Sequence, residues 1–255
     1  MYKRQARIDA RWGTVPEALP GNLVFDSGGL WRQYRDGSDQ IFRFHSAVFG
    51  ALPYKECRVR EDFRSGEVVL NRDYLDVGRP VYPLEYPLDE ILMLNLLSQS
   101  GGVEVHSCGI EDQDGRSYLF LGQSGAGKTT TARLWDGLPG VRILSDDRII
   151  LRVLDGHLWM YGTPWHGEGE FANPARARLD HIYFLGRGPT NVAIPLRSAE
   201  AVARLMTCSF LPFHNQSGLD FTLGFLQQVT QLAPSAELRF VPDRRAVDFV
   251  RSGNR

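Results

Sequence analysis

One segment, residues 122–129, constrains this chain more than any other. It reads GQSGAGKT and matches the pattern G-x-x-x-x-G-K-[ST] in full. In this pattern the glycines let backbone N–H groups surround phosphates, the lysine reaches the outer phosphates, and the hydroxyl residue binds Mg²⁺. The apolar run 117–121 predicts a buried strand before the loop, and residues 130–135 predict a helix after it. Because this order points a helix N-terminus at an anion, the segment predicts a phosphate-binding loop rather than a chance glycine-rich turn.

The expected nucleotide contacts follow from the loop. They are Gly122, Gln123, Ser124, Gly125, Ala126, Gly127, Lys128, Thr129 and Thr130. The chain has 29 basic residues, and only Lys3, Lys55 and Lys128 among them are lysines. A compact, flexible ammonium enters a narrow phosphate cradle better than a planar guanidinium does, which favours Lys128 as a phosphate-binding residue.

Composition excludes several classes of protein. The net charge of −1 gives no reason to expect a nucleic acid or an anionic membrane as partner. No apolar run approaches the roughly 18–20 residues that span a bilayer, and no apolar segment follows the charged N-terminus as it would in a secretory signal. Cys57, Cys108 and Cys208 are widely spaced, which favours reduced thiols. We therefore expect a cytoplasmic protein.

Two domains are expected. Residues 1–86 show the alternation of short strands and predict a small β-rich subdomain, whose arginines we place on solvated strand faces; docking of an acidic peptide is the alternative. Three prolines mark the segment 79–87, and residues 88–97 predict a buried helix. Residues 87–255 then predict a nucleotide-binding α/β domain with a mixed sheet.

Paired carboxylates follow the next strand. The apolar residues 141–145 lead into Asp146 and Asp147, 18 positions after Lys128. That spacing holds one helix, one turn and one strand, so we expect this strand beside the phosphate-loop strand, with both carboxyl ends at one edge. One aspartate then faces Mg²⁺ and the other takes a proton from an incoming hydroxyl; a turn or capping pair is the alternative.

Two further segments carry candidate side chains. Residues 103–110 and 117–121 predict a hairpin that brings His106 toward the loop, although a lone strand histidine is more often structural. The glycine-rich segment 162–171 contains Glu168 and Glu170, and we expect one of them to complete the ligands of the metal ion. Trp165 or His166 would then line the substrate pocket. The alternative is a surface loop without a functional role.

At these residues, about 101–185, the chain resembles the HPr kinase/phosphorylase and phosphoenolpyruvate carboxykinase superfamily. The resemblance implies that Asp146 is the general base, that Asp147 binds Mg²⁺, that His106 is functional, and that the nucleotide is ATP. The sequence 163–168 replaces the glycine-rich signature of true HPr kinases, so the chain looks more like the related kinases of lasso-peptide and other peptide-modification clusters.

These observations predict an ATP- and Mg²⁺-dependent kinase. It would transfer the γ-phosphoryl group to a hydroxyl acceptor, a serine of a peptide or small protein, with Lys128, Asp146 and His106 as catalytic groups. Thr129, Asp147, Glu168 and Glu170 are the expected metal ligands. A homo-oligomer is compatible with the sequence. The alternative function is a non-catalytic nucleotide-binding regulatory module, and the Asp146–Asp147 pair separates the two because a sensor needs no base.

Overall fold

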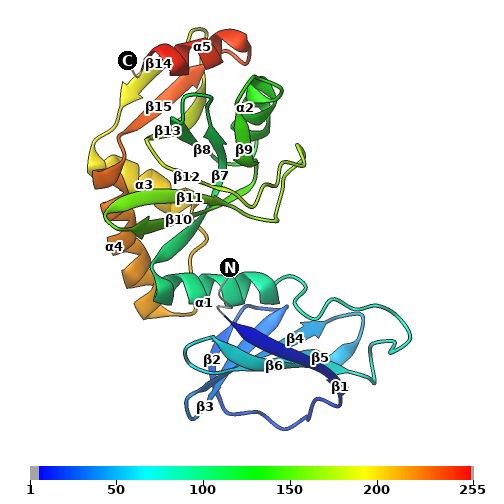
Figure 1. The fold of residues 1–255 in the computed structure, drawn as a ribbon. Helices are drawn as coiled ribbons and strands as arrows, with labels where there is room; N and C mark the ends of the chain where they lie inside the picture. The colour runs from blue at the N-terminus through cyan, green and yellow to red at the C-terminus, as the bar shows by residue number, and fades with distance from the viewer. Residues whose placement is uncertain (1–5, 254–255) are drawn as a thin grey trace. The chain divides into compact units, whose positions relative to one another are not determined.

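A computed structural model describes residues 6–253, and the chain divides into two compact units. The first unit runs to Gln99 and the second begins at Ser100. Each unit combines one mixed sheet with helical structure, one helix in the first unit and several in the second, so the chain belongs to the α/β class (Figure 1). No helix among residues 6–253 is long and apolar enough to cross a membrane.

The first unit is a six-stranded sheet with one helix. The strands lie in the order β1-β6-β5-β4-β3-β2, in which only the β1–β6 pair is parallel. Their bounds are β1 Arg7–Gly13, β2 Asn22–Asp26, β3 Trp31–Asp36, β4 Asp39–Ser46, β5 Gly50–Val59 and β6 Ser65–Asn71. Helix α1, Leu88–Ser100, contributes Leu88, Ile91 and Leu92 to the same buried cluster as Phe42 and Phe44 of β4. The division between the units therefore falls after α1, whereas the sequence-based boundary at residue 86 precedes it.

The arginines of this unit are largely paired within it. Arg43 is 3% exposed and donates a hydrogen bond to Glu56 at 2.7 Å, because the β4–β5 register places these two residues opposite one another. The expectation that these arginines lie on solvated faces is thus wrong for Arg43. Arg58 pairs with Asp36 and Asp39. Since their charges are neutralised locally, these residues offer little attraction to an acidic peptide.

The second unit is built on a nine-stranded sheet. The strand order is β12-β11-β10-β7-β8-β13-β15-β14, and β9 also pairs with β7. The bounds are β7 Gly102–Glu111, β8 Ser117–Leu121, β9 Arg142–Ser145, β10 Arg148–Leu154, β11 His157–Gly162, β12 Arg176–Arg178, β13 His181–Arg187, β14 Val192–Pro195 and β15 Ser235–Phe240. The helices are α2 Lys128–Trp135, α3 Ser198–Cys208, α4 Gln216–Leu232 and α5 Arg244–Ser252. The expected β7–β8 hairpin is confirmed.

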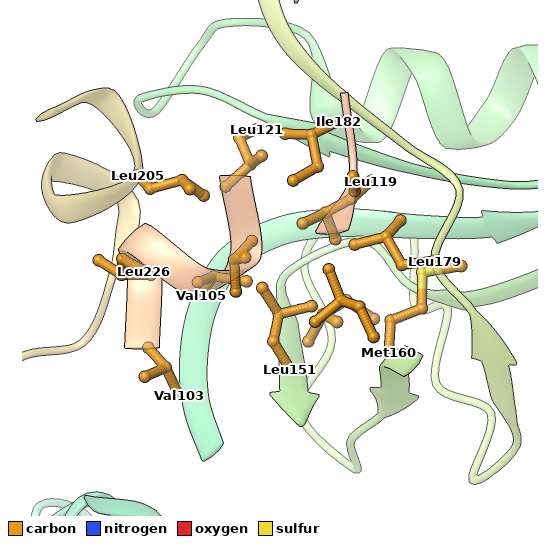
Figure 2. Packing of buried hydrophobic residues seen from close by; sticks show 14 of the residues in the cluster. Val103, Val105, Leu119, Leu121, Leu151, Met160, Leu179, Ile182, Leu205 and Leu226 are labelled. Carbon is orange, nitrogen blue, oxygen red and sulfur yellow. The ribbon is translucent and has the colours of Figure 1, made fainter. Parts of the chain in front are cut away.

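Helices cover both faces of this sheet. Side chains of β8 alternate between the faces, so Leu119 and Leu121 enter one buried cluster while Tyr118 and Phe120 enter another. Figure 2 shows the first cluster, where α3 and α4 pack on β7 and β8. The second cluster lies under α2 and α5, on the opposite face (Figure 1). Burial on both faces explains why β8 is apolar at nearly every position.

Strand β9 does not lie beside β8, so the expected strand order is wrong. It pairs with β7, and β8 lies on the other side of β7. Both strands run antiparallel to β7, with Leu121 opposite Ser107 and Ser145 opposite Gly109. The carboxyl ends of β8 and β9 therefore reach the same edge of the sheet, with β7 between them. Strand β7, which forms a hairpin with β8, lies between β8 and β9. A simple strand–helix–strand crossover would instead place β8 and β9 next to each other.

Candidate functional site

The loop between β8 and α2 has the backbone that its glycines permit. Gly125 and Gly127 have φ angles of 80° and 109°, in the left-handed region that side chains other than glycine rarely adopt. A Cβ on Gly122 would lie 2.5 Å from the Cβ of Ala126, so the turn closes only with glycine there. The loop follows a buried strand and leads into a helix, in the order expected from the sequence.

Lys128 lies folded over this loop. Its Nζ donates hydrogen bonds to the carbonyl oxygens of Gly122 at 2.7 Å and Gln123 at 3.1 Å. The side chain is buried, and this burial lowers the pKa of Lys128 against the smaller raising effect of nearby acidic groups. These two neutral carbonyl partners can be exchanged for phosphate oxygens when an anion enters the loop, because charged partners bind an ammonium more strongly.

Asp146 is the most constrained carboxylate of the site. It is 2% exposed and accepts hydrogen bonds from the backbone N–H groups of Gly167 at 2.8 Å and Gly169 at 2.9 Å, and from the Thr129 hydroxyl at 3.2 Å. A Cβ would lie 3.0 Å from Asp146 Oδ2 if built on Gly167, and 2.6 Å if built on Gly169. Glycine at 169 is therefore required for the segment to approach this carboxylate, and a side chain at 167 would fit only if the carboxylate shifted by a few tenths of an ångström.

Asp147 points to a different partner. Its Oδ1 lies 3.1 Å from His106 Nδ1, and the hydrogen bond from His106 is the main cause that lowers the pKa of Asp147, against the raising effect of burial. The Asp147 side chain is 25% exposed. Its backbone N–H donates to Ser145 Oγ at 3.1 Å, which orients the end of β9. The two adjacent aspartates therefore face two different neighbours.

One cavity of about 390 Å³ unites most of the predicted residues. It is lined by Ser124, Gly125, Gly127, Lys128, Thr129 and Thr130 of the loop and its helix. His106, Asp146, Asp147, Gly167 and Glu168 complete the lining. Within residues 6–253 the lining includes Glu168 but not Glu170, which is exposed and has a φ angle of 58°.

Two sets of contacts around the paired aspartates were not predicted from the sequence. The N–H groups of Gly167 and Gly169 hold Asp146, and the Gly-x-Gly spacing of the segment was the signal that could have indicated it. The Arg148 guanidinium forms two ion pairs, one with Asp147 at 3.4 Å and one with the fully buried Glu104 at 3.3 Å. Nothing local in the sequence predicts the Glu104–Arg148 pair, because its members lie on different strands.

The donor set suits a magnesium ion accompanied by a nucleotide. The Thr129 hydroxyl and the Asp146 carboxylate lie 3.2 Å apart, and Glu168 lines the same cavity. No group of three or more His, Cys, Asp or Glu side chains arranged for a metal occurs among the described residues. Mg²⁺ at phosphate-transfer sites uses one or two protein carboxylates and completes its shell with phosphates and water, so such a group is not required.

No family model matches the chain, and no curated protein matches it. Among solved structures the chain is similar to the HPr(Ser) kinase/phosphatase from Coxiella burnetii. The alignment has 12% identity and a TM-score of 0.35, and it covers 59% of this chain and 95% of that one.

Proposed function

We propose that this protein is an ATP- and Mg²⁺-dependent kinase that transfers the γ-phosphoryl group to a hydroxyl, such as a serine of a peptide or small protein. One observation carries the proposal: a single cavity combines a phosphate-binding loop with a hydroxyl–carboxylate pair for a metal and a separate histidine–carboxylate pair. The first pair is Thr129 and Asp146 at 3.2 Å, and the second is His106 and Asp147 at 3.1 Å. Phosphoryl transfer uses a phosphate cradle, a metal ion and a residue that takes or orients the hydroxyl proton, and these three groups could supply them.

The geometry favours an exchange of the roles that the resemblance implies for the two aspartates. Asp146 is buried beside the Thr129 hydroxyl and already accepts from two backbone N–H groups, so it suits a fixed position in the metal shell. A base must reach the acceptor hydroxyl. Asp147 is the more exposed of the two and lines the cavity beside His106, so we assign it the proton.

In the proposed reaction the acceptor oxygen attacks the γ-phosphorus. The bond from phosphorus to the β–γ bridging oxygen breaks, ADP leaves with that oxygen, and the hydroxyl proton passes to Asp147. Lys128 leaves the carbonyls of Gly122 and Gln123 and neutralises the outer phosphates. Mg²⁺, when bound at Thr129 and Asp146, would supply charge neutralisation on the phosphate oxygens. His106 orients the Asp147 carboxylate through its Nδ1–H.

The test compares Lys128→Ala with Gln123→Ala in the same loop. Lys128→Ala should lose measurable Mg·ATP binding in calorimetry and all transfer of label from γ-labelled ATP to proteins of a cell lysate. Gln123 was expected among the nucleotide contacts, but its side chain is exposed and does not line the cavity, and Lys128 contacts only its backbone carbonyl, so Gln123→Ala should keep both. Wild-type ATP affinity in Lys128→Ala would refute the nucleotide site. ATP binding by the wild type without transfer to any acceptor would favour the regulatory module instead.

A further inference from the structure

A second cavity lies against the first at the His106–Asp147 pair. It measures about 370 Å³ and is lined by these two residues, by Arg148 and by the segment 207–210 at the end of α3. His106 and Asp147 are the residues that line both cavities. Asp147, to which we assign the proton, and its partner His106 therefore border both the nucleotide cavity and the second cavity.

We propose that this second cavity is the acceptor subsite, and that it takes a serine or threonine hydroxyl of a peptide segment flanked by apolar or aromatic side chains rather than acidic ones. The proposal rests on the proposed kinase function and names its substrate class. A hydroxyl placed in this cavity has Asp147 within the lining to receive its proton, and Asp147 also lines the nucleotide cavity. The cavity volume is at the lower end of ligand sites, which suits one or two residues of a peptide.

Charge within the subsite argues against an acidic acceptor. Arg148 brings a guanidinium to the cavity, but this group is paired with the buried Glu104 at 3.3 Å and with Asp147 at 3.4 Å. Two carboxylates thus accompany one guanidinium, and the three groups together carry no net positive charge. Sites that recognise acidic or phosphorylated segments instead present arginines to the ligand.

Arg148 packs against two aromatic rings at this cavity. Its guanidinium carbon lies 4.4 Å from the centre of the Phe210 ring and 5.2 Å from that of the Trp165 ring. The Arg148 side chain is 16% exposed, so little of its surface is open to solvent. Phe210 is itself only partly buried and lines the cavity. A planar, partly exposed ring stabilised by a cation beneath it is a good surface for an aromatic or aliphatic side chain.

The hydroxyls of the subsite are arranged to accept hydrogen bonds. Thr207 Oγ1 donates its proton to the carbonyl of Arg204 at 2.8 Å, and Ser209 Oγ donates to the carbonyl of Leu205 at 2.8 Å. Because each proton is already used within the chain, the oxygens have only lone pairs left for a ligand. They therefore suit the backbone N–H groups of a peptide and would repel a carboxylate.

The experiment measures phosphorylation of short synthetic peptides with a central serine flanked on both sides by phenylalanine, glycine or glutamate. We expect kcat/KM to be at least about tenfold higher for the phenylalanine-flanked peptide than for the glutamate-flanked one. Phe210→Ala should raise KM for the phenylalanine-flanked peptide by about threefold to tenfold, while KM for ATP and for the glycine-flanked peptide stays near the wild-type value.

Phe213→Ala is the matched control, because Phe213 lies three positions further along, is 71% exposed and is not among the residues lining the subsite. It should leave all these constants unchanged. Preference for the glutamate-flanked peptide, or an equal effect of Phe210→Ala on all three peptides, would overturn the proposal. So would failure of every peptide to accept phosphate while labelled ATP still phosphorylates a lysate protein. If the wild-type protein does not bind ATP, the proposed kinase function is refuted, and this result is distinct from a failure of the acceptor subsite.

Discussion

Replacing Asp146 with asparagine keeps the size of the side chain but changes one acceptor into a donor. The Asp146 carboxylate accepts from Gly167, Gly169 and Thr129 at 2.8, 2.9 and 3.2 Å. An asparagine oxygen can serve one backbone N–H group, and the asparagine NH₂ then faces the other, which loses its acceptor. Because Asp146 is only 2% exposed, a water molecule has little room to act as the missing acceptor.

The magnitude follows from these contacts. A lost hydrogen bond to a charged group, with a buried donor left unsatisfied, costs about 2–4 kcal/mol. Relief of repulsion between the adjacent carboxylates of Asp146 and Asp147 offsets part of this cost. We therefore expect Asp146→Asn to lower the free energy of unfolding by about 1–3 kcal/mol, and to weaken the dependence of ATP binding on Mg²⁺ because a neutral amide is a poorer ligand for a hard cation.

Urea unfolding and calorimetry of ATP binding at several Mg²⁺ concentrations measure both effects. Asp147→Asn is the matched control, since its side chain is 25% exposed and its partners are side chains that can adjust. It should keep stability within about 1 kcal/mol and keep Mg·ATP binding, while phosphoryl transfer falls by about 10²–10⁴-fold. If Asp146→Asn instead keeps wild-type stability and Mg²⁺ dependence and loses only transfer, our assignment is refuted and Asp146 is the base.

Further predictions concern buried charges outside the reaction. Lys55 is fully buried, with Nζ 3.2 Å from Glu85 and 4.7 Å from the centre of the Phe44 ring. Glu85→Gln leaves the buried ammonium without its carboxylate and should lower the free energy of unfolding by about 1–3 kcal/mol. This loss is smaller than that expected for breaking a fully buried ion pair, because Glu85 is 43% exposed. Lys55→Met fills similar space without charge and should cost less in urea unfolding; the reverse order would contradict this account. Burial lowers the pKa of His214 to about 4. Because the unfolded chain binds this proton near pH 6.5 and the folded chain does not, stability should fall as pH drops from about 6.5 to 4, by up to about 3 kcal/mol. His214→Gln should flatten that part of the pH–stability curve, and an unchanged curve would exclude His214 as its source.

Much of the backbone of the loop at residues 122–129 could be predicted from the sequence because its determinants are local. The left-handed backbone at Gly125 and Gly127 depends on residue type at those positions, and the lysine and threonine follow at fixed spacing. The β7–β8 hairpin was also predictable, since a polar turn joins two apolar runs. These features need no knowledge of distant residues.

The different contacts of Asp146 and Asp147 were decided by the tertiary structure. Two adjacent carboxylates look alike in sequence, and they differ only because Gly167 and Gly169 contact one while His106 contacts the other. These partners come from strand β7 and from a loop beyond β11, and their approach depends on strand order. The sequence predicted β9 beside β8, whereas β7 lies between them.

The burial of Arg43 has the same origin, because Glu56 faces it only through the register of β4 and β5. By itself the sequence determined which chemical groups are present and the local backbone of the loop that carries Lys128. Only the tertiary structure decided which partner each charge receives. The reason is physical: backbone dihedral preferences act within a few residues, whereas desolvation and charge pairing depend on whatever the fold brings within a few ångströms.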